Sequence, residues 1–378
     1  MACVPLVITV HEAGHAAVAK LAGFRVTSFG VGYGRPILRH RGANGVVFYV
    51  GRWFWAGGSC VAVPRRLGAD PREALYHAGG VLAQAALAGA LALLPPTWWV
   101  EPVARFNLLV LAWNMVPWQL WGTQSDGWRF VRALSRGRLL SAPMFASRSA
   151  LARLLRFEET VGSPVGVWYC RLLLAWSDLL VGRQPEAFLA AESDPISVTD
   201  PAFDALQQHV LASGLIAAGQ PEAALRALAG VRSAHGASLP MASRDLLALT
   251  ESRAHLSRGA LADARSALSR LAGVSGPLGE EARVISLEIA LAEGDDAATG
   301  AAAARVAVRG VLDPPSAAAA LWRAGAVLGD DTLRQRAQAE AARLMMVAEP
   351  DDEPPLARRL GGAVGWSGEP PAPVPEVG

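Results

Sequence analysis

Two histidines four residues apart could bind a metal ion near the start of the chain. His11, Glu12 and His15 form an H-E-x-x-H motif. On a helix, residues i and i+4 lie on one face, one turn apart. Two imidazoles in that position can bind one Zn²⁺ at about 2.0–2.1 Å. A carboxylate at Glu12 could take a proton from a zinc-bound water and pass it to a leaving amine. The motif predicts His11 and His15 as zinc ligands and Glu12 as general base.

The alternative is a set of polar residues on an ordinary soluble helix. Residues 4–24 are apolar apart from the three motif residues and Lys20. Two histidines and a glutamate inside an apolar stretch are costly unless they are partnered. A metal ion is the simplest partner, so the context favours the metal site.

A catalytic zinc ion needs three protein ligands and one open position. Asp126 is the best candidate for the third ligand, because it follows an apolar segment that Pro117 interrupts and has glycines near it. The alternative for Asp126 is a helix N-cap, which Asp commonly forms. His40 and His77 are less well placed.

The composition indicates a membrane part joined to a soluble part. The 378 residues are 52% hydrophobic and 18% charged, and the mean hydropathy is +0.26. Three segments are long and apolar enough to be candidate spans of about 20 residues. They are residues 4–24, residues 78–94, and a segment from about Phe106 to Asp126.

The positions of the basic residues predict a topology. Nine Lys/Arg lie between residues 20 and 72, none between 73 and 104, and seven between 128 and 158. Since short basic stretches stay in the cytoplasm, residues 95–102 face outward, while residues 25–72 and everything after 128 face inward. The H-E-x-x-H motif then lies toward the cytoplasmic half, where Asp126 can meet it. The chain is therefore expected to be an integral membrane protein of a bacterial-type cell membrane.

Residues 46–63 are rich in Val, Phe, Tyr and Trp and predict a hairpin or small sheet at the cytoplasmic rim, broken at Gly57.

Gly30, Gly32 and Gly34 are expected to form a turn. No Lys-Ser/Thr follows them, so nucleotide binding is not expected. The net charge of +2 likewise gives no support for a nucleic-acid partner. Three cysteines without a C-x-x-C spacing argue against a disulfide framework.

Residues 150–346 show a pattern of amphipathic helices rich in Ala, Leu and Arg. Similar turns recur at Gly182, Gly219, Gly259 and Gly294, with spacings of 37, 40 and 35 residues. This resembles tetratricopeptide-like helical hairpins, whose period is about 34 residues. The region beyond it contains seven prolines from Glu349 onward and is expected to be disordered.

The N-terminal third of the chain resembles the site-2 protease family of intramembrane zinc metalloproteases. The resemblance is carried by the segment around H-E-x-x-H and by Asn114, Pro117 and Asp126-Gly127, which match the family's Asn-x-x-Pro and Asp-Gly landmarks with a longer gap. Residues 78–84 resemble the family's Ala-Gly-Pro-x-x-Asn element, with Gly80 and Gln84 substituted. These two substitutions are not expected to touch the metal.

The resemblance implies hydrolysis of a peptide bond in a membrane-spanning protein substrate. His11, His15 and Asp126 would hold the zinc ion and Glu12 would be the base. Asn114 would hold the substrate backbone, although an interhelical hydrogen bond would explain it equally well. The strands over 46–63 would accept an extended substrate as an added strand, or would serve only as structural cover.

Two rival functions are a soluble zinc hydrolase and an inactive membrane adaptor whose helical array recruits partners. The intact Glu12 argues against the adaptor, since a scaffold needs no base beside zinc.

The predicted fold is mainly α, with about three transmembrane helices, a small sheet and a soluble array of helical hairpins that could bind a protein partner. The predicted divisions are a zinc protease domain (1–130), a linker (131–149), a cytoplasmic repeat domain (150–346) and a disordered tail (347–378).

Overall fold

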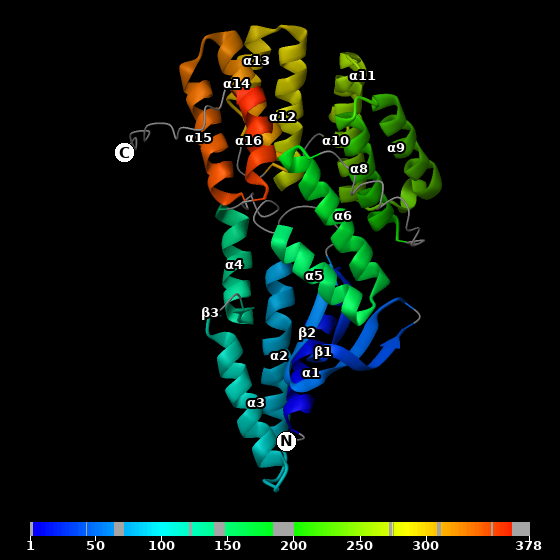
Figure 1. Cartoon of the computed structure of the whole chain (residues 1–378), viewed down its shortest axis with the longest axis vertical. Coiled ribbons are helices and arrows are strands. Elements are labelled where there is room, and N and C mark those ends of the chain that lie inside the picture. Colours follow the sequence, from blue (N-terminus) through cyan, green and yellow to red (C-terminus); the bar gives the residue numbers. More distant parts are fainter. Residues whose placement is uncertain are drawn as a thin grey trace. The chain divides into compact units, whose positions relative to one another are not determined.

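The computed structural model describes residues 3–42, 44–63, 72–120, 123–139, 148–183, 200–271, 274, 276–307, 311–348 and 351–364. The described chain is mainly helical with a small sheet, as the sequence predicted (Figure 1). It divides into two compact units. The first comprises Met1–Arg65, Ala69–Leu139 and Arg153–Cys170, and the second comprises Arg66–Gly68, Leu140–Ala152 and Arg171–Gly378.

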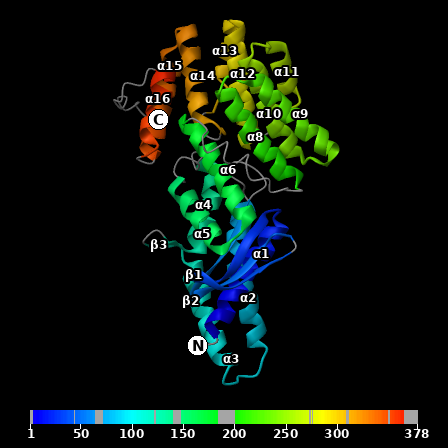
Figure 2. The same ribbon diagram turned by 45° about the vertical axis from the view of Figure 1, so that its right-hand side comes forward.

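Three apolar helices form the frame of the first unit. They are α1 (Cys3–Leu21), α2 (Arg72–Ala92) and α3 (Val100–Met115). Helix α2 packs against both α1 and α3 (Figure 2). Many of their large apolar side chains are exposed, including Leu6, Leu82, Leu109 and Trp113. Such a surface is unusual for a soluble protein.

Two helices of the described chain are long and apolar enough to cross a membrane: α2 and α6 (Pro164–Val181). Only 28% of the apolar window of α2 is buried, against 67% for α6, so α6 has the character of a core helix. Helix α1 falls outside this pair because its H-E-x-x-H motif is polar. Helix α3 has 16 residues, which is short for a span.

The third predicted span has different bounds from those expected. Helix α3 begins at Val100 and therefore includes Glu101 and Arg105, which form an exposed ion pair. It ends at Met115, just before Pro117, since the residue preceding a proline is disfavoured in the helical conformation. The described residues from there to Asp126 are not helical.

The sheet consists of two long, irregular strands, β1 (Arg25–Arg41) and β2 (Val47–Val63). Phe48 is paired with both Phe29 and His40, so the first half of β2 has a neighbour on each side. Residues 58–63, which we call the edge segment, pair with residues 25–31 only. In the part of the chain that the structure describes, the other edge of this segment therefore carries no strand.

The glycine run that was expected to be a turn lies inside β1. A Cβ on Gly30 would lie 2.0 Å from the carbonyl oxygen of Tyr49, and Gly32 has a φ of +85°. These glycines permit close strand contact and the irregular register of β1, so the prediction of a turn was wrong.

Helices α4 (Asp126–Leu139) and α5 (Arg148–Val161) occupy much of the region predicted as a linker. Helix α5 packs on the sheet, where Phe157 contacts Tyr49 and Ser28 donates a hydrogen bond of 2.7 Å to Glu158. Residues 153–170 accordingly belong to the first unit and not to the helical array. Residues 140–147 lie outside the described residues.

The described part of the second unit contains four helical hairpins, in which each first helix packs against the second (Figure 1). The pairs are α8 (Pro201–Ala217) with α9 (Pro221–His235), α10 (Met241–Ser257) with α11 (Leu261–Ser269), α12 (Gly276–Glu293) with α13 (Asp296–Ala303), and α14 (Pro314–Leu328) with α15 (Asp331–Val347). A short 3₁₀ helix, η2 (Gly236–Ser238), follows α9.

Three of the four predicted glycine turns connect the two helices within a hairpin, while Gly182 follows α6 and residues 184–199 lie outside the described residues. Gly219, Gly259 and Gly294 follow α8, α10 and α12 with positive φ values of 73°, 77° and 69°. A helix commonly ends in such a left-handed residue, where glycine is favoured. Gly329 makes a fourth turn of this kind, which sequence analysis missed. The helical array is thus present, whereas the tetratricopeptide label remains a prediction.

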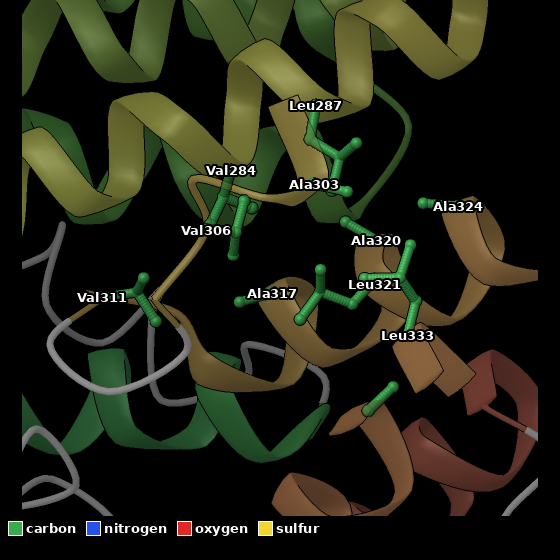
Figure 3. Packing of buried hydrophobic residues seen from close by; sticks show 11 residues of the cluster. Val284, Leu287, Ala303, Val306, Val311, Ala317, Ala320, Leu321, Ala324 and Leu333 are labelled. Carbon is green, nitrogen blue, oxygen red and sulfur yellow. The ribbon is translucent and has the colours of Figure 1, made fainter. Parts of the chain in front are cut away.

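Small residues allow the helices of this array to pack closely. In the core around α12, α13, α14 and α15, Leu287 and Leu321 interlock with several alanines, among them Ala317 and Ala320 (Figure 3). Alanine favours the helix and leaves room for the neighbouring backbone. Sequence alone thus indicates helices here through composition and periodicity together.

Helix α16 (Glu353–Val364) lies in the segment that was predicted to be disordered. Leu356 and Leu360 are fully buried, and Arg359 pairs with the buried Asp313. Pro354 and Pro355 stand in the first turn of the helix, where the missing N–H costs nothing. That part of the prediction was therefore wrong, and residues 349–350 and 365–378 lie outside the described residues.

Candidate metal centre

The two motif histidines lie side by side on α1 and are buried. Their Nε2 atoms are 3.2 Å apart, and their rings are nearly perpendicular with centroids 4.7 Å apart. The i, i+4 spacing gives this placement, since α1 is helical through the motif.

Asp126, the first residue of α4, meets both histidines. Its Oδ2 lies 2.9 Å from His11 Nε2 and 3.1 Å from His15 Nε2. Three ligand atoms bound tetrahedrally to zinc at about 2.0–2.1 Å would be separated by roughly 3.3 Å. The observed separations are close to that value. Among the described residues, these three form the cluster of His, Cys, Asp and Glu side chains suited to a metal ion.

The Nδ1 atoms of both rings have hydrogen-bond acceptors, which leaves the Nε2 atoms available to a metal. His15 Nδ1 lies 2.8 Å from the carbonyl oxygen of Tyr76, and His11 Nδ1 lies 3.1 Å from Oε1 of Gln84. A proton on each Nδ1 satisfies these contacts and leaves a lone pair on each Nε2. Two lone pairs and a carboxylate oxygen then face one another, an arrangement that a cation stabilises. The residues present therefore fit a zinc ion.

Asp126 is positioned by the irregular chain between α3 and α4. Ser125 Oγ accepts from the amide of Trp128 at 3.1 Å and donates to the carbonyl of Val116 at 2.7 Å. Ser125 thus caps α4, the role that had been the alternative for Asp126. The strands β3 (Gln119–Leu120) and β4 (Thr123–Gln124) pair as a short ribbon before it. Together these contacts leave the Asp126 carboxylate free to face the histidines.

Glu12 is buried beside this cluster but is not part of it. It is 7% exposed, and its side chain extends from α1 toward the edge segment. A Cβ on Gly58 would lie 2.7 Å from Glu12 Cγ and 2.8 Å from its Oε1. The edge segment thus passes directly over the carboxylate that was predicted to be the base.

Close contact between α1 and α2 depends on glycines. A Cβ on Gly14 would lie 2.4 Å from the carbonyl oxygen of Gly79. A Cβ on Gly80 would lie 2.4 Å from His11 Cε1 and 2.5 Å from His15 Nε2. Gly80 and Gln84 therefore contact the histidines directly. That these two positions do not touch the metal itself remains a prediction.

Asn114 is half-buried in the last turn of α3. Among the described residues, no hydrogen bond joins its side chain to the metal cluster, so its role in substrate binding remains a prediction. The fully buried amide of α3 is Asn107, whose Nδ2 donates to the carbonyl of Gln84 at 2.9 Å. Sequence analysis missed Asn107, although an amide in an apolar helix was a usable signal.

A helical unit with exposed apolar faces and a His-His-Asp cluster beside a glutamate defines the class of H-E-x-x-H metalloproteins. The model of peptidase family M50 matches residues 1–210, more than half of the chain, and the chain belongs to this family. The predicted kinship with site-2 proteases is thereby confirmed at the level of the family. The match does not include most of the helical array.

One curated relative comes from Synechocystis sp. (strain ATCC 27184 / PCC 6803 / Kazusa), and its name describes it as a zinc metalloprotease. It is 50% identical over 39 residues, which are 10% of this chain and 11% of the relative. The match therefore spans about a tenth of either protein. No solved structure matches the chain.

Proposed function

We propose that this protein is an intramembrane zinc metalloprotease that hydrolyses a peptide bond of a membrane-spanning protein. The observation that carries the proposal is the convergence of His11 Nε2, His15 Nε2 and Asp126 Oδ2 beside the buried Glu12. Membership in peptidase family M50 supports it.

In this proposal each residue has one task. His11, His15 and Asp126 would hold a zinc ion, which would act as a Lewis acid toward water. Glu12 accepts a proton from the attacking water and passes it to the leaving nitrogen. The contacts of Tyr76 and Gln84 hold the two rings with their Nε2 atoms toward the cluster.

The edge segment is the proposed binding place for the substrate. It has an unpaired edge in the described structure and passes over Glu12 at Gly58. An unwound stretch of a substrate helix could pair with it as an added strand, which exposes a peptide bond. Asn114 would then hold the substrate backbone from the opposite side.

The exposed apolar side chains of α1, α2 and α3 support a membrane location for these helices. Helix α2 has the required length and composition, and the polar motif of α1 would be tolerated because it faces the protein interior. We place the H-E-x-x-H motif toward the cytoplasmic half, and the helical array, with a protein partner, in the cytoplasm.

A reporter fusion tests this topology. A reporter enzyme that works only in the cytoplasm is expected to be active when it is joined after Trp128, because basic residues flank this position. A matched fusion after Thr97, in the loop without basic residues, should report the outside. Inverted results for the two fusions would contradict the topology.

Removal of zinc tests the proposed activity. Detergent-purified wild-type protein is expected to contain about one zinc ion per chain, as a three-ligand site holds one ion. A chelator should abolish cleavage of a reconstituted single-span substrate, and added Zn²⁺ should restore it. Well-folded protein without zinc or cleavage would favour the rival function, a membrane adaptor that recruits partners.

A further inference from the structure

Gln84 contacts His11 on the side of the ring that faces away from Asp126. Its side chain is fully buried in α2, and its Oε1 lies 3.1 Å from His11 Nδ1. On the same ring, Nε2 lies 2.9 Å from Asp126 Oδ2. The imidazole is thus held at both nitrogens.

The orientation of the Gln84 amide decides where the proton of His11 resides. With Oε1 toward the ring, Nδ1 must donate, so Nε2 carries a lone pair and can bind a metal. With the amide nitrogen toward the ring, the proton would lie on Nε2 and would point at Asp126. The observed orientation is therefore the one that makes His11 a metal ligand.

Asn107 fixes the backbone of Gln84 from the third helix. Its Nδ2 donates to the carbonyl oxygen of Gln84 at 2.9 Å, and both residues are 0% exposed. This bond joins α3 to α2 at the level of His11. It also gives the Gln84 carbonyl a partner from outside its own helix.

The two amides are costly at these positions. In the described structure, Gln84 Nε2 and Asn107 Oδ1 are buried without a hydrogen-bond partner. A buried polar atom without a hydrogen-bond partner destabilises the folded chain. Apolar residues would stabilise these helices better, so the contact between Gln84 and His11 accounts for a glutamine at this position.

We propose that Gln84 is a positioning residue that sets the metal-binding orientation and tautomer of His11, and that Asn107 holds Gln84 in place. This inference rests on the proposed zinc site. It assigns a role to a position at which the chain departs from the asparagine of the related element. The longer side chain of glutamine places its oxygen one methylene farther from α2, where it reaches the ring.

The test is the zinc dissociation constant of the detergent-purified full chain, measured against a competing chelator. Gln84→Met keeps the length of the side chain but removes the acceptor. It is expected to weaken zinc binding about 10–100-fold, the usual effect of losing a ligand's hydrogen-bond partner. Gln84→Glu retains an acceptor and should stay within about threefold of wild type by the same argument. Leu82→Met, an exposed change on the same helix, is the matched control.

Each outcome decides the matter. Unchanged zinc affinity in Gln84→Met overturns the inference, as does equal loss in Gln84→Met and Gln84→Glu, since a purely structural role would not be rescued by an acceptor. Gln84→Asn is a second, polar variant. Its side chain is too short to reach His11, so this variant of the protein should also bind zinc more weakly than wild type. Wild-type protein that binds zinc but cleaves nothing would defeat the proposed protease function alone. Wild-type protein that binds no zinc would overturn both.

Discussion

Replacement of Glu12 by glutamine is expected to abolish peptide hydrolysis and to leave zinc in place. Glutamine has nearly the same shape, so it fits the buried space beneath Gly58. It cannot accept a proton from water at neutral pH. Since general acid–base catalysis contributes about 10²–10⁴-fold, the cleavage rate should fall by that factor. The measurement is the initial rate on a reconstituted single-span substrate, together with zinc content per chain.

The matched control for this change is Glu101→Gln on α3. Glu101 is exposed and pairs only with Arg105 in the described structure, so its replacement should change neither rate nor zinc content. Full activity in Glu12→Gln would remove Glu12 from the mechanism. A loss of zinc in the same variant would mean that Glu12 is a ligand and would require a different base.

The His-His-Asp cluster was predictable because two of its three residues are close in the sequence. His11 and His15 are one helical turn apart, and a helix fixes their relation without help from the rest of the fold. Asp126 required a second argument, from charge placement and from the apolar segment before it. Asp126 does lie against both histidines, although α3 ends eleven residues before it. Its role as a metal ligand remains a prediction.

The surroundings of the cluster were not predictable in the same way. Gly80, Gln84 and Asn107 act through the packing of α1, α2 and α3, and no spacing rule relates residues that are 23 or 73 positions apart. Nor does composition show that the edge segment passes over Glu12. These contacts depend on which helix faces meet, and that is settled by the glycine contacts between Gly14 and Gly79.

The end of the chain shows how composition can mislead. Seven prolines after Glu349 favour disorder, yet Leu356 and Leu360 lie one turn apart on one helix face and are fully buried. Arg359 adds an ion pair with Asp313, a residue far away in the sequence. Tertiary contacts of this kind outweigh local propensity, and a single sequence does not reveal them.

Replacement of Asp126 by alanine is expected to remove most of the zinc. Asp126 Oδ2 is the only charged ligand of the three, and it contacts both histidine nitrogens. Loss of a direct ligand should weaken zinc binding by at least about 100-fold, the upper end of what an indirect partner contributes. The measurement is the zinc dissociation constant of the purified chain, with the exposed Asp263→Ala as the control.

Charge gives Asp126 a role beyond that of a third donor. A divalent ion enclosed by apolar helices is stable only if nearby anions balance it, and Asp126 and Glu12 supply two carboxylates at this site. Asp126→Asn retains an oxygen donor without the charge, so its zinc affinity should lie between those of wild type and Asp126→Ala. If Asn binds zinc as tightly as Asp, charge balance has no part in the site. If alanine does so as well, the third ligand lies elsewhere, and the buried His77 becomes the residue to replace next.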